Sequence, residues 1–341
     1  MEKNENARPA ARFRIVVPTR NRPNDLARLL SALAPQLRRR RDFALVIVND
    51  GSDSDAYRSV IAPYEDLLTY LASSENLGIG PARQLGLVDA QEEYVVTTDD
   101  DCIPGPLWLD RIAALADAHA GADIFAGFTD AVPSGGGRFF RAWSALPNTT
   151  PEVVTDPLGL VTAVTANAVF RREYFTSAAP LTLNLPYAPD DYHVTQAALR
   201  AGASFRVETR LRTGHILHPQ FFDYLRRQYR YGLAAAEYAI VFNDRRLAGM
   251  LGDPSIARAL ARGREGMLRQ WREARRTGFF ERSVSALLGG LAAFSLQLGW
   301  LRGANRFGRE HGKSIPGALS LGDQFSAFCL DVDLASNPPE R

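Results

Sequence analysis

Residues 94–101 read Tyr94-Val95-Val96-Thr97-Thr98-Asp99-Asp100-Asp101, a run of β-forming residues that leads directly into three carboxylates. Adjacent carboxylates repel one another unless a cation or hydrogen-bond donors compensate them. Mg²⁺ and Mn²⁺ prefer oxygen ligands and commonly bridge carboxylates to substrate phosphates. Because alternate residues of an extended segment face the same way, Asp99 and Asp101 can share one site while Asp100 points elsewhere. The stretch therefore indicates a strand that ends at a divalent-metal site, with an acidic turn before a helix near Pro106 as the alternative.

The rest of the first half repeats this strand pattern. Short apolar runs alternate with helical patterns, which predicts a parallel sheet covered by helices on both faces. In such sheets ligands bind beyond the carboxyl ends of the strands, and Pro18, Asp50 and Asp99 all follow such ends. We therefore expect one binding site at this edge of an α/β fold. The predicted strands are 13–17, 44–48, 67–71 and 94–98, and the predicted helices are 23–37 and 80–90.

The pattern is looser after residue 120. Stretches rich in Gly and Pro predict loops at residues 134–137 and 147–157, and the second loop could border a substrate. The remaining expected elements are a strand at 162–170, a helix at 190–201 that stops at Gly202, a strand at 204–211 and a helix at 221–244.

The composition is typical of a folded protein from a reducing compartment. The chain has 341 residues, a net charge of +2 and two cysteines, which are too few and too far apart for a disulfide framework or a zinc cluster. The first twelve residues are polar and charged and lack the apolar stretch of a secretory signal. We therefore expect a cytoplasmic protein.

The C-terminal third is basic and contains one long apolar segment. Residues 221–310 hold 16 Arg, no Lys and 8 Asp or Glu, a net charge of +8. Such a segment favours anionic partners, and a set of solvated helix faces is an equal alternative. Residues 283–301 reach the length of a membrane span, but their many Gly, Ala and Ser make them only weakly hydrophobic. We expect a helix that packs on the domain or lies on the inner face of the membrane.

Two more polar residues lie where strands or helices are expected to begin or end. Asp50, in Val48-Asn49-Asp50-Gly51-Ser52-Asp53, could accept hydrogen bonds from a base or ribose, or could only form the turn before a helix. Arg83 lies near a predicted helix N-terminus, and a guanidinium in that place suits a diphosphate.

Carboxylates and imidazoles also occur in the second half. Asp190 and Asp191 open a predicted helix, where the helix dipole favours acidic residues in any case. Their functional interpretation is a general base, since an acceptor hydroxyl must lose its proton as it attacks. His215 and His218 follow the last predicted strand and are either polar surface residues or a third metal ligand.

Taken together, these segments resemble the family 2 glycosyltransferases, which have the nucleotide-sugar-binding fold called GT-A. The resemblance extends from about residue 13 to residue 232, and its motifs occur in the order found in that family. The residues that carry it are Val17-Pro18-Thr19-Arg20-Asn21-Arg22, Val48 to Asp53, Asn76-Leu77-Gly78-Ile79-Gly80-Pro81-Ala82-Arg83, Asp99 to Pro104, Thr165 to Arg172, and Asp190-Asp191 with Arg200-Ala201-Gly202.

The resemblance implies a role for most of the singled-out residues. Asp101 would ligate Mn²⁺ or Mg²⁺ with Asp99, and His215 would complete the metal site, with His218 as the fallback. Asp191 matches the catalytic base of the family. Asp190 stays open as the base because the family usually has Glu-Asp at this place. The residues assigned to the nucleotide sugar are Pro18, Thr19, Asn21, Asp50, Arg83, Asp99 and Asp100.

The resemblance also implies the fold, the partners and the reaction. We expect a GT-A domain at residues 12–232, with a mixed, mostly parallel sheet between helices, and a helical extension at residues 233–341. The enzyme would move a sugar, with inversion, from a UDP-, GDP- or dTDP-sugar to a hydroxyl of a glycan, a lipid-linked or a small-molecule acceptor. Nucleic acid is not an expected partner, and a peripheral membrane contact is. The alternatives are a nucleotidyltransferase of related fold and a non-catalytic nucleotide-sugar binder at the membrane.

Overall fold

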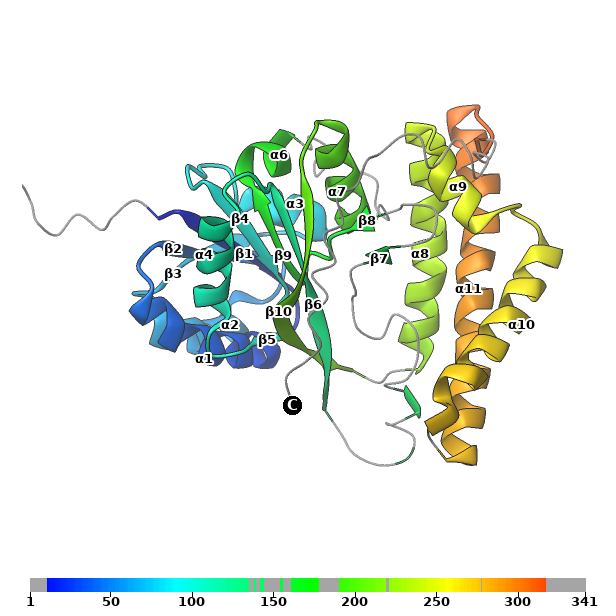
Figure 1. Cartoon of the computed structure of the whole chain (residues 1–341), viewed down its shortest axis with the longest axis horizontal. Coiled ribbons are helices and arrows are strands. Elements are labelled where there is room, and N and C mark those ends of the chain that lie inside the picture. Colours follow the sequence, from blue (N-terminus) through cyan, green and yellow to red (C-terminus); the bar gives the residue numbers. More distant parts are fainter. Residues whose placement is uncertain are drawn as a thin grey trace, which may run out of the picture.

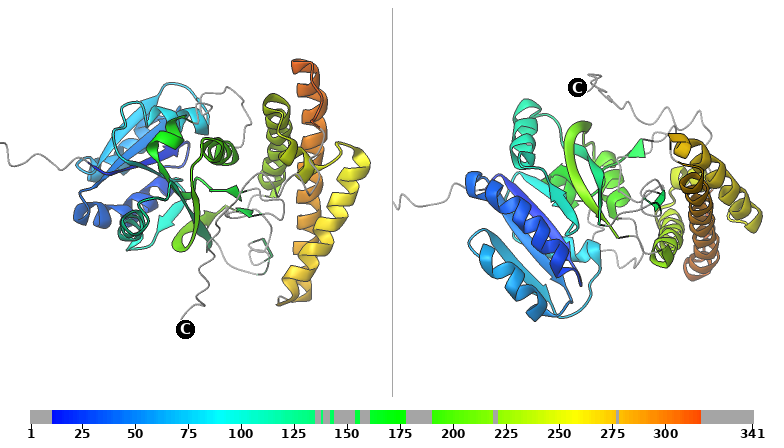
Figure 2. Two further views of the ribbon diagram at one scale, coloured as in Figure 1. Left: turned by 45° about the horizontal axis from the view of Figure 1, so that its top comes forward. Right: turned by 90° about the horizontal axis from the view of Figure 1, so that it is seen from below.

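The computed structural model describes residues 11–134, 138, 142–143, 154–155, 161–177, 190–218, 221–276 and 278–316. These residues form a layered α/β body and, beside it, a group of long helices (Figures 1 and 2). The loops predicted at residues 134–137 and 147–157 lie outside the described residues, apart from Ser134, Val154 and Thr155.

The α/β body is built on an eight-stranded sheet with the strand order β3-β2-β1-β4-β9-β6-β10-β5. Neighbouring strands from β3 to β4 are parallel, as are β6 and β10, whereas β9 runs antiparallel to both β4 and β6. The predicted mixed, mostly parallel sheet is therefore confirmed. The strands are β1 (Phe13–Thr19), β2 (Phe43–Asp50), β3 (Leu68–Ser73), β4 (Tyr94–Thr98), β5 (Cys102–Pro104), β6 (Ile124–Pro133), β9 (Asn167–Arg171) and β10 (Phe205–Leu217).

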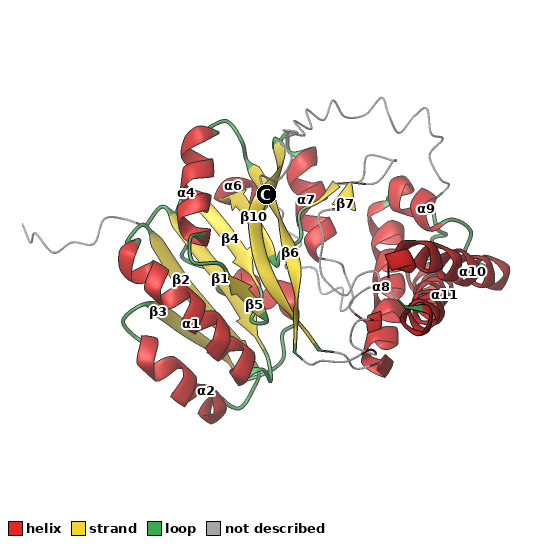
Figure 3. Cartoon of the chain, turned by 60° about the horizontal axis from the view of Figure 1, so that its bottom comes forward, coloured by secondary structure: helices red, strands yellow, loops and turns green. Residues whose placement is uncertain are grey.

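Helices cover both faces of this sheet because the central strands are apolar on both sides. Ile15 and Val17 of β1 face one core with α1, α2 and α4, whereas Val16 faces the other core with α3, α6 and α7. Figure 3 shows α1, α2 and α4 together on the first face. The helices are α1 (Pro23–Arg39), α2 (Ser54–Ile61), α3 (Ile79–Leu85), α4 (Trp108–Ala118), α6 (Arg172–Ser177) and α7 (Asp190–Arg200).

The C-terminal helices pack closely on one another through glycines. A Cβ added at Gly299 of α11 would overlap the carbonyl oxygen of Tyr229 in α8, and one added at Gly232 of α8 would overlap that of Leu296. The C-terminal elements are α8 (Phe221–Phe242), α9 (Arg245–Leu251), α10 (Ile256–Glu273), the short 3₁₀ helix η3 (Ala274–Arg276) and α11 (Phe279–His311). Two further short elements lie earlier in the chain. They are the two-stranded pair of β7 (Val154–Thr155) and β8 (Val161–Thr162), and the 3₁₀ helix η1 (Ala62–Tyr64), which follows α2.

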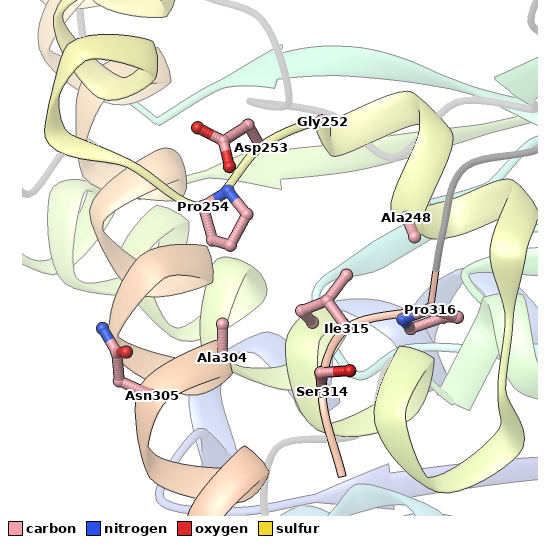
Figure 4. Close-up of a pocket in the computed structure, with 9 residues that line it drawn as sticks. All are labelled: Ala248, Gly252, Asp253, Pro254, Ala304, Asn305, Ser314, Ile315 and Pro316. Carbon is pink, nitrogen blue, oxygen red and sulfur yellow. The ribbon is translucent and has the colours of Figure 1, made fainter.

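A cavity of about 440 Å³ lies among these C-terminal elements (Figure 4). Most of the described lining side chains are small or uncharged, and the carboxylate of Asp253 is the one charged group among them. The lining residues are Ala248, Gly252, Asp253, Pro254, Ala304, Asn305, Ser314, Ile315 and Pro316.

Two of the element boundaries that differ from the sequence prediction bear on the site. The strand expected at residues 204–211 continues to Leu217 because its second half pairs with β5 and β6, so His215 lies within β10 rather than after it. The helix expected at residues 80–90 ends at Leu85. The predicted domain boundary between residues 232 and 233 stays a prediction, and both residues lie inside α8.

The glycine contacts predict an unusual effect of alanine. In a helix interior Gly→Ala normally stabilises by about 1 kcal/mol, but Gly299→Ala should destabilise by roughly 1–3 kcal/mol because α8 and α11 must move apart. Urea unfolding followed by circular dichroism measures the change. Gly121→Ala, in a turn, is the control for an added methyl group alone, since a Cβ there meets nothing within 4 Å. An unchanged midpoint for Gly299→Ala would contradict the packing.

Candidate active site

The polar site lies at the carboxyl ends of the parallel strands, where β4 leads into the three aspartates. Asp99 is 23% exposed, and one of its oxygens, Oδ1, accepts a hydrogen bond from Arg83 Nη2 at 2.7 Å. Arg83 itself is fully buried in α3. The structure therefore places Arg83 as an internal partner of Asp99.

Asp100 and Asp101 are buried and share one arginine. Arg22 Nη1 lies 2.6 Å from Asp101 Oδ2 and 3.3 Å from Asp100 Oδ1. Thr19 Oγ1 donates to Asp100 Oδ2 at 2.8 Å. The Arg22 side chain is 47% exposed, so the cation that compensates these two carboxylates reaches solvent and can move.

Burial decides the protonation of Asp100. Desolvation, reinforced by the charge of Asp101, raises the pKa of Asp100 to about 7, although Arg22 and Thr19 act in the opposite direction. The same two carboxylates raise the pKa of Arg22, against the lowering effect of its own burial. One arginine thus compensates the pair only partly, and the site keeps an affinity for positive charge.

Asp101 and His215 lie next to each other at this edge of the sheet. His215 Nε2 lies 3.4 Å from Asp101 Oδ1, and that oxygen is buried with no hydrogen-bond donor among the described residues. No group of three His, Cys, Asp or Glu side chains suited to a metal occurs in the described part of the chain. The donor set still fits Mn²⁺ or Mg²⁺, because such ions are usually bound by one or two protein groups together with substrate phosphates and water.

His218 lies elsewhere. Its Nε2 is 3.0 Å from Asp25 Oδ2, at the first turn of α1. Of the two histidines, the structure therefore brings His215 to the aspartates and pairs His218 with another acidic residue.

Asp50 supports a loop. Its Oδ1 accepts a hydrogen bond from the Leu77 N–H at 2.5 Å and its Oδ2 from the Gly78 N–H at 3.0 Å. Gly78 has φ +91°, a conformation that favours glycine. Asp50 thus fixes the segment that leads into α3 and, through it, the position of Arg83.

The end of β1 and the residues that follow it border the site next to Asp100. Pro18 and Thr19 are buried in β1. Asn21 is exposed, has φ +55°, and its N–H donates to Ser52 Oγ at 2.9 Å. These residues therefore join the carboxyl ends of β1 and β2.

Asp191 lies in the first turn of α7, and Thr165 orients its carboxylate. Thr165 Oγ1 donates to Asp191 Oδ1 at 2.9 Å. Asp190 is the first residue of α7, and its side chain lies outside the described residues.

Sequence reasoning did not single out three residues of this site. Arg22 and Thr165 stood inside the quoted motifs, and the signal for them was a charged or hydroxyl side chain next to a strand end. Tyr57 had no local signal. Its hydroxyl lies 3.1 Å from Thr19 Oγ1 and accepts the Arg22 N–H at 2.9 Å, contacts that only the packing of α2 creates.

The sheet order and the acidic strand end define a GT-A fold, the class of nucleotide-sugar transferases. The solved structure of the mannosyltransferase PcManGT from Pyrobaculum calidifontis, in complex with GDP-Man and Mn²⁺, has the same fold, with a TM-score of 0.57 and 18% identity over 86% of this chain and 88% of that one. The model of the family "Glycosyl transferase family 2" matches residues 14–177. Residues 14–177 of the chain belong to this family, and the protein is a glycosyltransferase.

Two curated relatives agree with this assignment. The glycosyltransferase AglE of Haloferax volcanii is 23% identical over 221 residues, which cover 64% of this chain and 71% of AglE. The validoxylamine A glucosyltransferase of Streptomyces hygroscopicus subsp. jinggangensis is 36% identical over 110 residues, which cover 31% of this chain and 25% of that protein.

The raised pKa of Asp100 predicts how the stability of the metal-free enzyme depends on pH. In the unfolded chain this carboxyl ionises near pH 4, whereas in the folded protein its pKa is about 7. Its stabilising contribution is therefore complete below about pH 4 and is lost as the pH rises to about 7. Asp100→Asn should exceed the wild type in free energy of unfolding by roughly 1–3 kcal/mol near pH 8, and by less near pH 5.

Urea unfolding in the presence of EDTA tests this prediction. The control is Asp89→Asn, because Arg14 lowers the pKa of that exposed carboxyl and its removal should bring no gain near pH 8. A difference between Asp100→Asn and the wild type that stays constant with pH would refute the protonation described for Asp100.

Proposed function

We propose that the enzyme transfers a sugar from a nucleotide-diphosphate donor to an acceptor hydroxyl with inversion of configuration, Asp191 acting as general base. The observation that carries the proposal is the convergence of Asp101 and His215 beside an arginine that both compensates the aspartates and reaches solvent. This arrangement offers room for a second, divalent positive charge where a diphosphate would lie. The resemblance to family 2 supplies the stereochemistry.

Asp101 and His215 would hold Mn²⁺ or Mg²⁺. Asp99 would contact the ribose or a water molecule bound to that ion. The metal, when bound, would neutralise the charge that develops on the departing nucleoside diphosphate. Arg83 would orient Asp99 through the 2.7 Å hydrogen bond and act on the diphosphate only through that carboxylate.

Arg22 would act as an exchangeable counter-ion. Without ligand it compensates Asp100 and Asp101, and a divalent cation would replace it there. Because the side chain reaches solvent, the freed guanidinium can turn to the diphosphate, for which its planar group of donors is suited. The negatively charged diphosphate of the donor would thus pair with the Arg22 guanidinium that the aspartates have released.

The nucleotide would bind against the side of the site formed by Pro18, Thr19, Asn21 and Asp50. Thr19 contributes chiefly by holding Asp100, and Asp50 by holding the backbone at residues 77 and 78. Each oxygen of Asp50 has a second lone pair, with which it could accept a hydrogen bond from a base or ribose.

Asp191 would take the proton of the acceptor hydroxyl while that oxygen attacks the anomeric carbon. Thr165 holds one oxygen of the carboxylate, which fixes its direction, and a positioned base of this kind accelerates proton transfer by about 10²–10⁴-fold. GDP-mannose in PcManGT and the small-molecule acceptor named for the Streptomyces relative suggest the classes of donor and acceptor to screen first.

Asp191→Asn tests the base. We expect transfer to fall by at least about 10²-fold, while the thermal shift produced by nucleotide sugar with Mn²⁺ remains, because the amide preserves the shape and the Thr165 contact. Asp190→Asn is the matched variant, since it removes the neighbouring carboxylate of the same turn. Full activity of Asp191→Asn together with inactive Asp190→Asn would transfer the role to Asp190.

The two histidines test the metal site. His215→Ala should raise the Mn²⁺ concentration needed for half-maximal activity by roughly tenfold or more, because one of two protein ligands is lost. His218→Ala should leave it unchanged, since that imidazole pairs with Asp25. The Mn²⁺-dependent thermal shift with nucleoside diphosphate gives a second measurement that does not depend on turnover, and equal effects of both variants would argue against His215 as a ligand.

A further inference from the structure

α11 is packed against neighbours on two of its faces. Gly299 and Gly303 lie against α8, and Gly289 and Gly290 lie against α10. By length and composition α11 could cross a membrane, but half of its most apolar window is buried inside the protein. Contacts with α8 and α10 therefore occupy the helix on two sides, which is unlike a helix surrounded by lipid.

The third face of α11 is apolar and open. Phe280 and Leu287 are 47% and 58% exposed, and Leu291, Phe294 and Leu298 are partly exposed. Their spacing of seven, four, three and four residues places them on one face of the helix. No charged residue occurs between residues 283 and 301, so the face is uninterrupted over about 27 Å.

α10 extends this face. Ile256, Leu260 and Met267 share one side of the helix by their spacing and are 64%, 61% and 40% exposed. A Cβ added at Gly290 of α11 would lie 3.1 Å from that of Met267, so this side of α10 borders α11. We call the exposed apolar residues of the two helices together the α10–α11 surface.

Aromatic and basic residues surround the end where the two helices meet. Phe279 is 79% exposed and its ring packs edge-on against Trp271, with centroids 5.8 Å apart. The guanidinium of Arg282 lies 4.1 Å from the centre of the Trp271 ring. Aromatic rings beside arginines are typical of the boundary between lipid tails and headgroups.

The charge of these helices is strongly one-sided. Residues 256–311 hold eleven Arg, four Glu and no Lys or Asp, a net charge of +7. Arg264, Arg272, Arg275 and Arg302 are exposed. Burial, together with repulsion from Arg258 and Arg269, lowers the pKa of Arg262, so positive charge in α10 is in excess of what its own glutamates compensate.

We propose that the α10–α11 surface docks on an anionic lipid bilayer, with the helices lying in the headgroup region. An exposed apolar face flanked by arginines fits this partner in both hydrophobicity and charge. A second copy of the chain fits less well, because a two-fold contact would bring together two copies of residues 256–311, each with a net charge of +7.

α11 and α8 also contact the connection between β6 and β9. Ser285 Oγ of α11 donates to the Ala142 carbonyl at 2.9 Å, and Trp143 packs on Tyr224 of α8 with ring centroids 5.1 Å apart. Residues 142 and 143 belong to the connection between β6 and β9, two strands of the catalytic sheet. A lipid-bound helix pair would therefore hold this connection near the membrane, where a lipid-linked acceptor is found.

Vesicle flotation of the full-length protein tests the proposal. Vesicles of phosphatidylcholine alone are compared with vesicles containing phosphatidylglycerol, at about 0.05 M and about 0.5 M salt. We expect binding to the anionic vesicles that weakens at high salt. Leu260→Gln combined with Leu287→Gln should reduce partitioning at least about tenfold, since both side chains are exposed and Gln preserves helix propensity.

Two matched variants separate apolar from electrostatic contributions. Val88→Gln removes an apolar side chain that is 75% exposed on the α/β body and should bind like the wild type. Arg264→Gln with Arg272→Gln should reduce the preference for anionic vesicles by roughly tenfold. If the leucine variant melts early, Phe279→Gln takes its place, because that ring is 79% exposed.

Three results would overturn the proposal. They are a wild type that stays unbound with anionic vesicles, a leucine variant that floats like the wild type, and a wild-type dimer in light scattering that the leucine substitutions convert to a monomer. None of these measurements depends on sugar transfer, so the docking and the catalytic proposal stand or fail separately.

Discussion

Repulsion among the three carboxylates after β4 is the constraint on which the site depends. Each aspartate is held by a cation or hydroxyl from another element: Arg83 of α3 for Asp99, Thr19 of β1 for Asp100, and Arg22 for both Asp100 and Asp101. Removing a partner would leave a buried carboxylate without compensation, which is costly. The need to compensate charge thus holds β1, α3 and β4 together at the same edge, and it leaves Asp101 Oδ1 buried with no hydrogen-bond donor among the described residues.

The sequence predicted most of the α/β body because its signals are local there. The runs at residues 13–17 and 94–98 are apolar on both faces, and such runs become central parallel strands. β6 was not recognised, since Ile124–Pro133 contains Gly127, Thr129 and Asp130 and reads as a loop. Asp50 accepts hydrogen bonds from residues 77 and 78, and His218 pairs with Asp25. Both contacts join segments that are distant in sequence, so no local pattern predicts them.

The helical part also supports the candidate base. Tyr192, next to Asp191, donates from its hydroxyl to Asp244 Oδ2 at 2.9 Å, and its ring packs edge-on against Tyr238 of α8. Arg200, at the other end of α7, lies 3.3 Å from the Tyr238 hydroxyl. α7 is therefore held between the sheet and α8, and its position depends on a helix that reaches beyond the matched family region.

This dependence explains why the C-terminal helices have close glycine contacts and an exposed apolar face at once. Close packing of α8 on α11 makes one rigid support, because a glycine contact between backbones leaves no side chain that could adapt. The support holds α7 on one side and residues 142 and 143 on another. A surface that binds α10 and α11 would then fix the orientation of the whole catalytic edge, and the acceptor would be presented to Asp191 from a defined direction.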